Sequence, residues 1–333
     1  MANRLCTVLG IKRPIISAPM GGAVGPDFTA LISNLGGMGV IPLWRAAGPD
    51  IRNAVAEIKH QTDKPFAVNL NIEFLQDDQI PACLDAGVPA ISLFWGMSPD
   101  AIKQVKDGGA KAIVTVGNSQ EAKIAVDAGA DVIVAQGWES GGHVWGKVAT
   151  MGLVPAVVDV CGDVPVVAAG GIADSRGAAA AYALGAVGVW VGTRFLAAQE
   201  MQIHEIYRAA LLAADDDASF HAHDLYNVGW ENAPHRALKN KTYESWVDAG
   251  RPSPGSRSGE GETIGMSGAG QPISAYRSWT PGPKDTGDIG EMSMWAGQGT
   301  AQLRDVMPAS DIMDELDQGA FKHLSSLQGV IKS

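Results

Sequence analysis

The amino-acid sequence predicts a (β/α)8 barrel, the TIM-barrel fold, and three observations lead to that prediction. Four stretches, "DAGVPAIS", "DGGAKAIV", "DAGADVIV" and "ALGAVGVW", repeat one pattern: the end of a helix, a glycine and a short run of apolar residues. Glycine at such a position suits the left-handed conformation that terminates helices. The first three stretches begin at Asp85, Asp107 and Asp127, a spacing of about one strand plus one helix. The third observation is a set of eight apolar runs along the chain.

These eight runs are the predicted strands, and in chain order they cover residues 13–20, 38–43, 65–71, 90–94, 111–117, 131–137, 164–171 and 187–192. They are almost continuously apolar, as expected of parallel strands that are buried on both faces. The intervening stretches, such as "SPDAIKQVK" and "NSQEAKIAV", begin with a capping Ser or Asn and have helical apolar periodicity. A doubly wound open sheet is the alternative, because the number of strands does not prove that the sheet closes.

The sequence changes character after the eighth strand, which predicts two parts: a barrel over 1–197 and an extension over 198–333 that packs over the barrel mouth. Residues 250–290 are rich in Gly, Pro and Ser, like a disordered linker. They also carry large apolar residues, which favour an ordered, irregular excursion: Ile264, Ile273, Tyr276 and Trp279. The chain is expected to close with an amphipathic helix, "ASDIMDELDQGAFKHLSSLQ", whose apolar side contains Ile312, Met313, Leu316 and Phe321.

Composition excludes several classes of protein. The 333 residues are 46% hydrophobic, enough for a large core, and the net charge of −11 argues against a general nucleic-acid or anionic-membrane binder. No apolar run approaches the roughly 20 residues of a membrane span, and "MANRLCTVLGIKRP" lacks a secretory apolar region, so we expect a cytoplasmic protein. Three widely spaced cysteines, Cys6, Cys83 and Cys161, indicate neither a disulfide framework nor a metal knuckle.

A phosphate site is predicted at the ends of the last two strands. Active sites of such barrels lie on the loops that follow the carboxyl ends of the strands. Gly170 and Gly171 follow the seventh strand, and Gly192, Thr193 and Arg194 follow the eighth at the start of a predicted helix. Backbone N–H groups in such turns, together with a helix N-terminus, can bind an anion. Glycine-rich turns also serve helix–strand packing alone, but two of them on adjacent strands favour phosphate binding.

Uncharged polar side chains, Asn69, Thr115 and Gln136, also end strands and suit the edge of a planar heterocycle. No metal site is predicted: "HAHD" (221–224) is more typical of a solvated surface. No serine stands in a nucleophile-elbow motif. A bound phosphorylated cofactor is therefore the favoured reading.

The motifs "APMGG", "PFAVNLN", "VIVAQGWESGGHVWG", "PVVAAGGIAD", "GVWVGTRFLA" and "MWAGQG" occur in this order. Over residues 10–320 the chain thereby resembles the nitronate monooxygenase family, formerly called 2-nitropropane dioxygenases. The Gln-Gly-x-Glu-x-Gly-Gly-His stretch is the most specific motif. The resemblance implies a TIM barrel that contains FMN, with His143 facing the flavin and acting on the substrate.

The resemblance also implies a set of cofactor residues. The backbone bed for the isoalloxazine matches Ala18, Pro19, Met20 and Gly21. Asn69 and Gln136 match side chains that reach the flavin, and Gly141 and Gly171 match glycines beside the phosphate. The segment that closes over the phosphate matches Trp190, Val191, Gly192 and Thr193, and a late loop that returns to the flavin matches Gln298. Thr115 stands where relatives more often have Gln or Lys, and Gly142 and Gly170 complete the two Gly-Gly turns. Two departures are Ser140, where relatives often have Ala, and Trp295, where Tyr is common; the second changes the lining of the substrate pocket.

His143 has two interpretations from its local sequence: a loop histidine that caps a carbonyl, or an acid–base group above the flavin. An imidazole near its ordinary pKa of about 6.5 can remove the proton next to a nitro group, or stabilise an anionic nitronate when charged. Gly141 and Gly142 leave room for the approach to the cofactor. Aromatic residues on the strand-end and late loops are expected to line the substrate pocket: Phe94, Trp95, Trp138, Trp145 and Trp295.

The implied reaction is oxidation of alkyl nitronates, or of nitroalkanes, by O2 to carbonyl compounds and nitrite. The competing hypothesis is an NAD(P)H-dependent quinone or enoyl reductase on the same FMN barrel, and the third is a non-catalytic FMN carrier. The expected partners are the small-molecule substrate and O2, without nucleic acid or membrane, and the C-terminal helix is a candidate interface for a homodimer.

Overall fold

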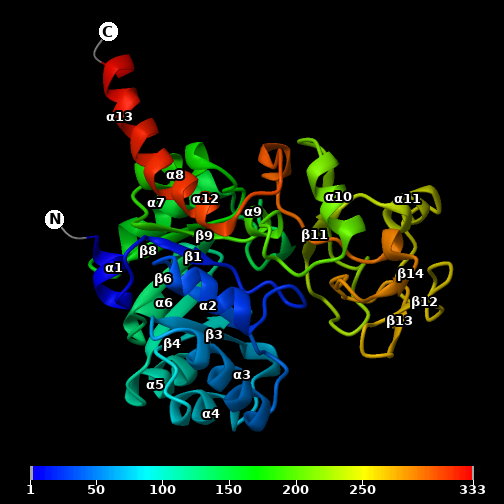
Figure 1. Cartoon of the computed structure of the whole chain (residues 1–333), viewed down its shortest axis with the longest axis horizontal. Helices are drawn as coiled ribbons and strands as arrows, with labels where there is room; N and C mark the ends of the chain where they lie inside the picture. The colour runs from blue at the N-terminus through cyan, green and yellow to red at the C-terminus, as the bar shows by residue number, and fades with distance from the viewer. Residues whose placement is uncertain (1–2, 332–333) are drawn as a thin grey trace.

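Eight parallel strands form one closed sheet in this computed structural model, which describes residues 3–331 (Figure 1). The strands neighbour one another in the order β1-β9-β8-β6-β5-β4-β3-β2. Their bounds are β1 Ile15–Ser17, β2 Gly39–Pro42, β3 Phe66–Asn71, β4 Ala90–Phe94, β5 Lys111–Val116, β6 Val132–Gln136, β8 Val166–Ala169 and β9 Gly188–Val191. All eight predicted strands are thus present, each within its expected run.

Closure of the barrel depends on the contact between the first two strands. Ile16 of β1 forms a parallel bridge with Met38, which directly precedes β2. The amide of Met38 donates to Ile15 at 3.0 Å, and the amide of Ser17 donates to Met38 at 3.0 Å. Both edges of the sheet are therefore joined, which confirms the (β/α)8 prediction over the open sheet.

Helices surround the barrel and cover its outer face: α2 Pro26–Asn34, α3 Gly48–Gln61, α4 Gln79–Asp85, α5 Pro99–Asp107, α6 Ser119–Asp127, α7 Thr150–Cys161 and α8 Ser175–Ala183. Ser98 and Asn118 cap α5 and α6 as the sequence predicts, accepting from the amides of Ala101 and Glu121. The short α1 (Arg4–Leu9) packs Leu5 and Leu9 into the same cluster as the inward-facing residues of the strands. It follows that the cluster is covered on the α1 side, so that the accessible end of the barrel is the opposite one.

The chain leaves the barrel after β9 and forms a lobe beside it (Figure 1). The single-turn α9 Thr193–Leu196 directly follows β9 and stays at the barrel. The lobe contains α10 Glu205–Ala213, α11 Lys241–Asp248 and the strands β10 Ser219–Ala222, β11 His235–Leu238, β12 Thr263–Met266, β13 Pro272–Ser274 and β14 Thr286–Gly287. Residues 250–290 are ordered around β12–β14, with Ile273 and Tyr276 buried, as expected. One lobe strand joins the barrel directly, because β11 pairs with β7 (Gly142–His143) in the loop after β6.

The last helical segment returns to the barrel and packs against α8 and α9: α12 Ala309–Asp314, the π-helical turn Glu315–Gly319 and α13 Ala320–Ile331. Ile312, Met313 and Leu316 are fully buried, as predicted. Phe321 is 59% exposed, and its ring stacks on that of Tyr182 in α8, so it lies on the side of the helix that faces the barrel. The division at residues 197 and 198 stays a prediction. No helix within residues 3–331 is long and apolar enough to cross a membrane.

Candidate active site at the barrel mouth

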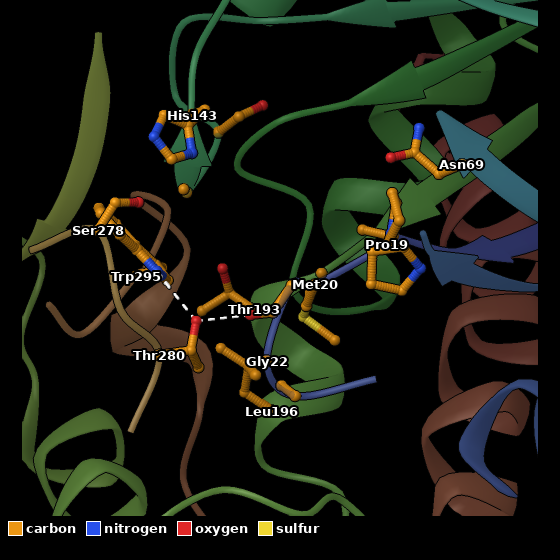
Figure 2. Close-up of a pocket in the computed structure, with 18 of the residues that line it drawn as sticks. Pro19, Met20, Gly22, Asn69, His143, Thr193, Leu196, Ser278, Thr280 and Trp295 are labelled. Carbon is orange, nitrogen blue, oxygen red and sulfur yellow. Dashed lines mark hydrogen bonds between the residues drawn. The ribbon is translucent and has the colours of Figure 1, made fainter. Parts of the chain in front are cut away.

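A cavity of about 790 Å³ lies between the carboxyl ends of the strands and the lobe (Figure 2). Its wall includes His143 and most of the residues expected to hold a cofactor: Ala18, Pro19, Met20, Gly21, Asn69, Thr115, Gln136, Gly141, Gly142, Gly170, Gly171, Trp190, Gly192 and Thr193. Of the expected substrate-pocket aromatics, Phe94 and Trp295 line it. Residues far apart in the sequence thus meet at one end of the barrel.

Two predicted cofactor residues do not line this cavity. Val191 is 1% exposed and packs in the core between strands and helices, because successive strand residues point to opposite faces and its neighbour Trp190 points inward. Gln298 belongs to a loop whose glycines, Gly297 and Gly299, line the cavity instead. The backbone amide of Gln298 donates to the carbonyl of Glu139 at 2.9 Å.

Three predicted pocket aromatics lie behind the wall rather than on it. Trp95 is buried and packs edge-on against both His143 and Trp145. Trp145 donates its indole N–H to Glu121 at 2.9 Å, and Trp138 packs beneath the guanidinium of Arg236 at 4.1 Å. These residues support the loop that carries His143, because their rings pack against neighbours outside the cavity lining.

The glycine-rich side of the cavity fits a phosphate group. Gly170 and Gly171 both have positive φ, +107° and +71°, as a tight turn after β8 requires. A Cβ atom on Gly299 would lie 2.7 Å from the Cβ of Ala173 and 3.0 Å from the carbonyl oxygen of Gly171. A side chain at Gly299 is therefore excluded where the turn after β8 meets the late loop.

Ser140 supports the same assignment. Its hydroxyl is buried against the turn and has no hydrogen-bond partner among the described residues, while the residue lines the cavity. An unpaired buried hydroxyl costs free energy unless a ligand satisfies it. Ser140 stands where relatives often have Ala, so this chain has an additional donor beside the glycines.

A helix N-terminus contributes less than the sequence suggests. The predicted helix after the eighth strand is the single turn α9. The N-terminus of α8 is already capped by Asp174, whose carboxylate accepts from the amides of Arg176 and Gly177, each at 2.9 Å. An anion in this part of the cavity would consequently be bound by loop backbone and hydroxyl groups rather than by a helix N-terminus.

Asn69 and Gln136 differ in what their amides do. Asn69 donates to Ser92, with distances of 3.3 Å to its carbonyl and 3.2 Å to its hydroxyl, and its own amide oxygen is turned to the cavity (Figure 2). Gln136 uses both ends of its amide on the β7 loop, donating to His143 O at 3.1 Å and accepting from Trp145 N at 2.9 Å. Gln136 is therefore a positioning residue for His143.

His143 lies at the junction of the two walls. Its ring centroid is 3.9 Å from that of Trp230 and 5.2 Å from that of Trp295, both from the lobe. Nε2 is buried and has no hydrogen-bond partner among the described residues. The interpretation of His143 as a carbonyl cap is thus not supported at Nε2, which is shielded from solvent, although the residue itself lines the cavity.

The environment of His143 keeps its imidazole neutral. Burial, then the neighbouring His235 and Arg45, lower the pKa of His143 well below 6.5, so the expectation of an ordinary pKa is wrong. His235 is also held neutral, because burial lowers its pKa to about 4. Its Nε2 accepts from Tyr226 N at 3.2 Å, and its Nδ1 lies 2.9 Å from the carbonyl of Ala233.

Sequence reasoning missed the lobe side of the cavity and part of the loop after β2. The missed lining residues include Trp44, Arg45, Trp230, Arg277, Trp279 and Thr280. Trp44 and Arg45 follow the second predicted strand directly, so the strand-end rule itself would have found them. Thr280 donates to the carbonyl of Gly21 at 2.6 Å and accepts from the indole N–H of Trp295 at 3.1 Å, which fixes the lobe to the loop after β1 (Figure 2).

Metal chemistry has no support in the part of the chain that the structure describes, since no group of three His, Cys, Asp or Glu side chains gathers there. His221 of the "HAHD" segment packs against Trp138 at 5.2 Å instead.

A closed parallel barrel with a glycine-rich cavity at the carboxyl ends of its strands is the architecture of TIM-barrel enzymes. The nitronate monooxygenase family model matches residues 2–82 and 70–319. The chain belongs to that family, whose members are flavin-dependent oxidoreductases.

Several relatives and solved structures are similar to this chain. A (3aS,4S,5R,7aS)-5-hydroxy-7a-methyl-1-oxo-octahydro-1H-indene-4-carboxyl-CoA dehydrogenase of Rhodococcus jostii is 36% identical over 64% of this chain, and the matched region spans 60% of that protein. A nitronate monooxygenase of Paraburkholderia phytofirmans is 29% identical over 97% of this chain and 96% of the relative. Among solved structures, FabK from Thermotoga maritima superposes with a TM-score of 0.85 at 30% identity, covering 99% of both chains.

Proposed function

We propose that this protein is an FMN-dependent nitronate monooxygenase, which oxidises alkyl nitronates with O2 to carbonyl compounds and nitrite. The observation that carries the proposal is the position of His143, which lines the same cavity as the glycine turn. The nitronate monooxygenase of P. phytofirmans, which matches nearly the whole chain, supports this reaction class.

The residues on the barrel side fit FMN. Gly170, Gly171 and the Ser140 hydroxyl would hold the phosphate, while the Ala18–Gly21 segment and the Asn69 amide oxygen would contact the ring system. When bound, the flavin supplies the electron transfer and the reaction with O2. No GxGxxG motif follows the first strand, which argues against a dinucleotide bound in the manner of FAD or NAD on a Rossmann fold.

His143 would act on the nitro group rather than on a carbon-bound proton. A neutral imidazole carries one N–H and one lone pair, and His143 lines the cavity in which an oxygen of the substrate would lie. A low pKa makes the same imidazole a weak base, and a base far below the operating pH removes a proton inefficiently. We therefore expect the enzyme to favour the pre-formed nitronate over the neutral nitroalkane.

The aromatic residues of the lobe would exclude water from this step. Trp230 and Trp295 lie against the imidazole of His143, and Trp279 lines the same cavity. An apolar, water-poor site strengthens the hydrogen bond between the imidazole and an anionic substrate.

Two measurements test the proposal. Absorbance and mass spectrometry of the ligand released from purified protein should show one non-covalent FMN per chain, and a colourless protein that does not take up FMN would contradict the cofactor. Under anaerobic conditions, ethyl nitronate should then bleach the flavin band rapidly. Rapid bleaching by NADH or NADPH with no response to nitronate would contradict the reaction.

The second candidate is a nicotinamide-dependent reductase on the same barrel. It is favoured by the structural match with FabK over 99% of both chains and by the 36% sequence identity with the carboxyl-CoA dehydrogenase of R. jostii. The anaerobic experiment separates the two functions, because only the reductase requires a nicotinamide for reduction of the flavin.

A further inference from the structure

The outer face of α7 is apolar, whereas the neighbouring helices of the barrel have charged outer faces. The sequence of α7, "TMGLVPAVVDVC", contains one charged residue, Asp159. On the two preceding helices the exposed positions include Lys103 and Asp107 in α5 and Lys123 and Asp127 in α6. A helix on the outside of a globular protein normally keeps charged and polar residues on the side away from the core. The outer face of α7 therefore lacks the composition of a face that contacts only water.

The exposed residues of α7 follow helical spacing and form one stripe, here called the α7 stripe. It consists of residues 148, 151, 152, 155, 156, 159 and 160, which are separated alternately by three positions and by one. Asp159 is the only polar residue among them, and the large apolar members are well exposed: Val148 41%, Met151 67% and Val160 39%. Val148 precedes the helix but belongs to the stripe, because a Cβ atom on Gly152 would lie 3.8 Å from Val148 Cγ1.

Exposed apolar side chains are concentrated at this place in the fold. Eight large apolar side chains are exposed in the described part of the chain, and four of them lie on the α7 stripe or on α6, which packs beside α7: Val148, Met151, Val160 and Ile124. Single exposed apolar residues are normal, whereas a group of them marks a contact with another molecule. No residue of the stripe lines the barrel-mouth cavity, and α7 lies on the side of the barrel away from the lobe (Figure 1).

Charge favours a second copy of this chain as the molecule that covers the stripe. A net charge of −11 keeps two copies apart unless the faces that meet are nearly neutral, and the α7 stripe contributes one carboxylate per copy. Lys147 directly precedes the stripe, and Asp159 lies near its other end; both are exposed. Neither forms an ion pair with another described residue. The stripe thus carries opposite charges at its two ends.

A twofold axis makes these charges complementary. In a twofold dimer the same surface of both copies meets, so two α7 helices that cross the axis run antiparallel. Lys147 of each copy then lies beside Asp159 of the other, and the axis passes near Leu153, midway between them. A parallel arrangement would place like charges together at both ends. Exposed ion pairs contribute little affinity, but they select the orientation in which the apolar residues meet.

We propose that the α7 stripe is the contact between two copies of this chain, related by a twofold axis that sets their α7 helices antiparallel. Burial of Val148, Met151 and Val160 from both copies supplies the apolar centre of the contact, with Lys147 and Asp159 at its rim. This inference does not depend on the proposed reaction. It also places the contact on the barrel rather than on the C-terminal helix, for which the sequence offered a candidate interface.

Sedimentation velocity of the full-length protein over a range of micromolar concentrations tests this inference. The wild type should sediment as a dimer that dissociates on dilution. Met151→Lys should raise the dissociation constant of the dimer at least about tenfold, because it places one unpaired charge per copy in an apolar contact. The matched control is Ile206→Lys, which changes an exposed apolar residue of α10 in the lobe and should leave the dissociation constant unchanged.

Charge reversal tests the antiparallel arrangement. Lys147→Glu and Asp159→Lys should each weaken the dimer, because each places like charges side by side at both ends of the contact. The double variant Lys147→Glu/Asp159→Lys should recover the affinity of the wild type, since it exchanges the two charges. A double variant that is weaker than both single variants would contradict the arrangement.

Cross-linking provides a second measurement that does not depend on a destabilising substitution. Gly152 lies beside the proposed axis and has room for a side chain. Two antiparallel helices in contact are about 8–10 Å apart, so Gly152→Cys should be cross-linked to its own copy by a short bismaleimide. Ile206→Cys should not be cross-linked, and the wild type provides the background, because Cys83 and Cys161 are buried.

The outcomes that overturn the inference are specific. A wild type that stays monomeric at all these concentrations, or a dimer that Met151→Lys does not weaken, shows that the α7 stripe is not the contact. Cross-linking of Ile206→Cys without cross-linking of Gly152→Cys leads to the same conclusion and moves the contact to the lobe. Circular dichroism and melting temperature identify a variant that fails to fold, and the Gly152→Cys result then decides.

Discussion

The two walls of the cavity are built on different principles. The barrel wall consists of strand ends and glycine turns, with backbone and small polar groups such as Ser140 and Asn69 facing the cavity. The lobe wall consists of large side chains, Trp230, Trp279 and Trp295 among them, that reach the cavity from irregular segments. The barrel wall follows from the fold, whereas the lobe wall is specific to the chain. We therefore expect the first to determine the cofactor and the second to determine what reacts with it.

The largest expected effect concerns His143, the residue at which the walls meet. His143→Ala should leave FMN bound, because the barrel wall is intact, and should lower the rate with ethyl nitronate by about 10²-fold or more. Loss of a positioned catalytic group costs 10²–10⁴-fold, or about 3–5 kcal/mol of barrier. Steady-state kinetics with flavin content measured in parallel provides the test. Near-normal turnover by a variant that contains a full complement of FMN would show that His143 is a loop residue without a catalytic role.

The pairing of β7 with β11, which forms the seam between the two walls, should lose stability in acid. His143 and His235 are paired across β7 and β11, and burial lowers the pKa of each in the folded state. Below about pH 6.5 the unfolded chain binds protons that the folded chain does not, so the free energy of unfolding falls as the pH falls.

For His235, with a folded pKa of about 4, this loss approaches about 3 kcal/mol at pH 4. Melting temperatures from pH 8 to pH 4 give the measurement, and His235→Asn is the comparison variant, since it removes one of the two titrations. A wild-type melting temperature that does not change between pH 8 and pH 4 would show that neutral histidines do not stabilise the seam.

Adjacent glycines of the barrel wall should respond unequally. A Cβ on Gly141 would lie 2.4 Å from the amide nitrogen of Gly297, whereas a Cβ on Gly142 would meet nothing within 4 Å, although its φ is +70°. Gly141→Ala should therefore destabilise the protein by about 1–3 kcal/mol through overpacking. Gly142→Ala should cost about 1–2 kcal/mol through backbone strain alone. Denaturant unfolding of both variants measures the two losses of stability. A smaller loss of unfolding free energy for Gly141→Ala than for Gly142→Ala would contradict the close contact.

The smallest expected effect concerns the connection between the walls at Thr280. Thr280→Val removes the hydrogen bond to Gly21 and leaves the indole N–H of Trp295 without its acceptor, at a cost of about 1 kcal/mol. The exposed Thr286 provides the control variant Thr286→Val. If the two substitutions change the melting temperature equally, the Thr280 bridge does not hold the lobe.

The sequence predicts the barrel wall well because its signals are local. Strands buried on both faces read as apolar runs, and turns that need positive φ read as glycine, as at Gly170 and Gly171. Val191 alternates with the inward-pointing Trp190, so its side chain packs in the core and only its backbone remains for the predicted cofactor contact. The lobe wall has no such signal. The proximity of Trp230 to His143 depends on the pairing of β7 with β11, which no local pattern in either segment indicates.

Gln136 illustrates a third case. Its position at the end of β6 is predictable, but its partners depend on how the following loop folds back. That loop places both His143 O and Trp145 N within reach of the amide, so the side chain orients the histidine. Strand-end position thus identifies which residues are near the site, while hydrogen bonding decides whether each contacts a ligand or supports a neighbour.

The return of α12 and α13 to the barrel has a consequence for how the protein is made. β9, the last strand of the barrel, ends at Val191, but the helices that pack against α8 and α9 begin only at Ala309, after the whole lobe. During synthesis the ribosome therefore releases all eight strands before the segment that covers α8. Contacts between residues so distant in sequence form slowly, and intermediates with uncovered apolar surface are prone to aggregate. Expression yield should accordingly depend on chaperones that shield α8 until translation reaches the last helices.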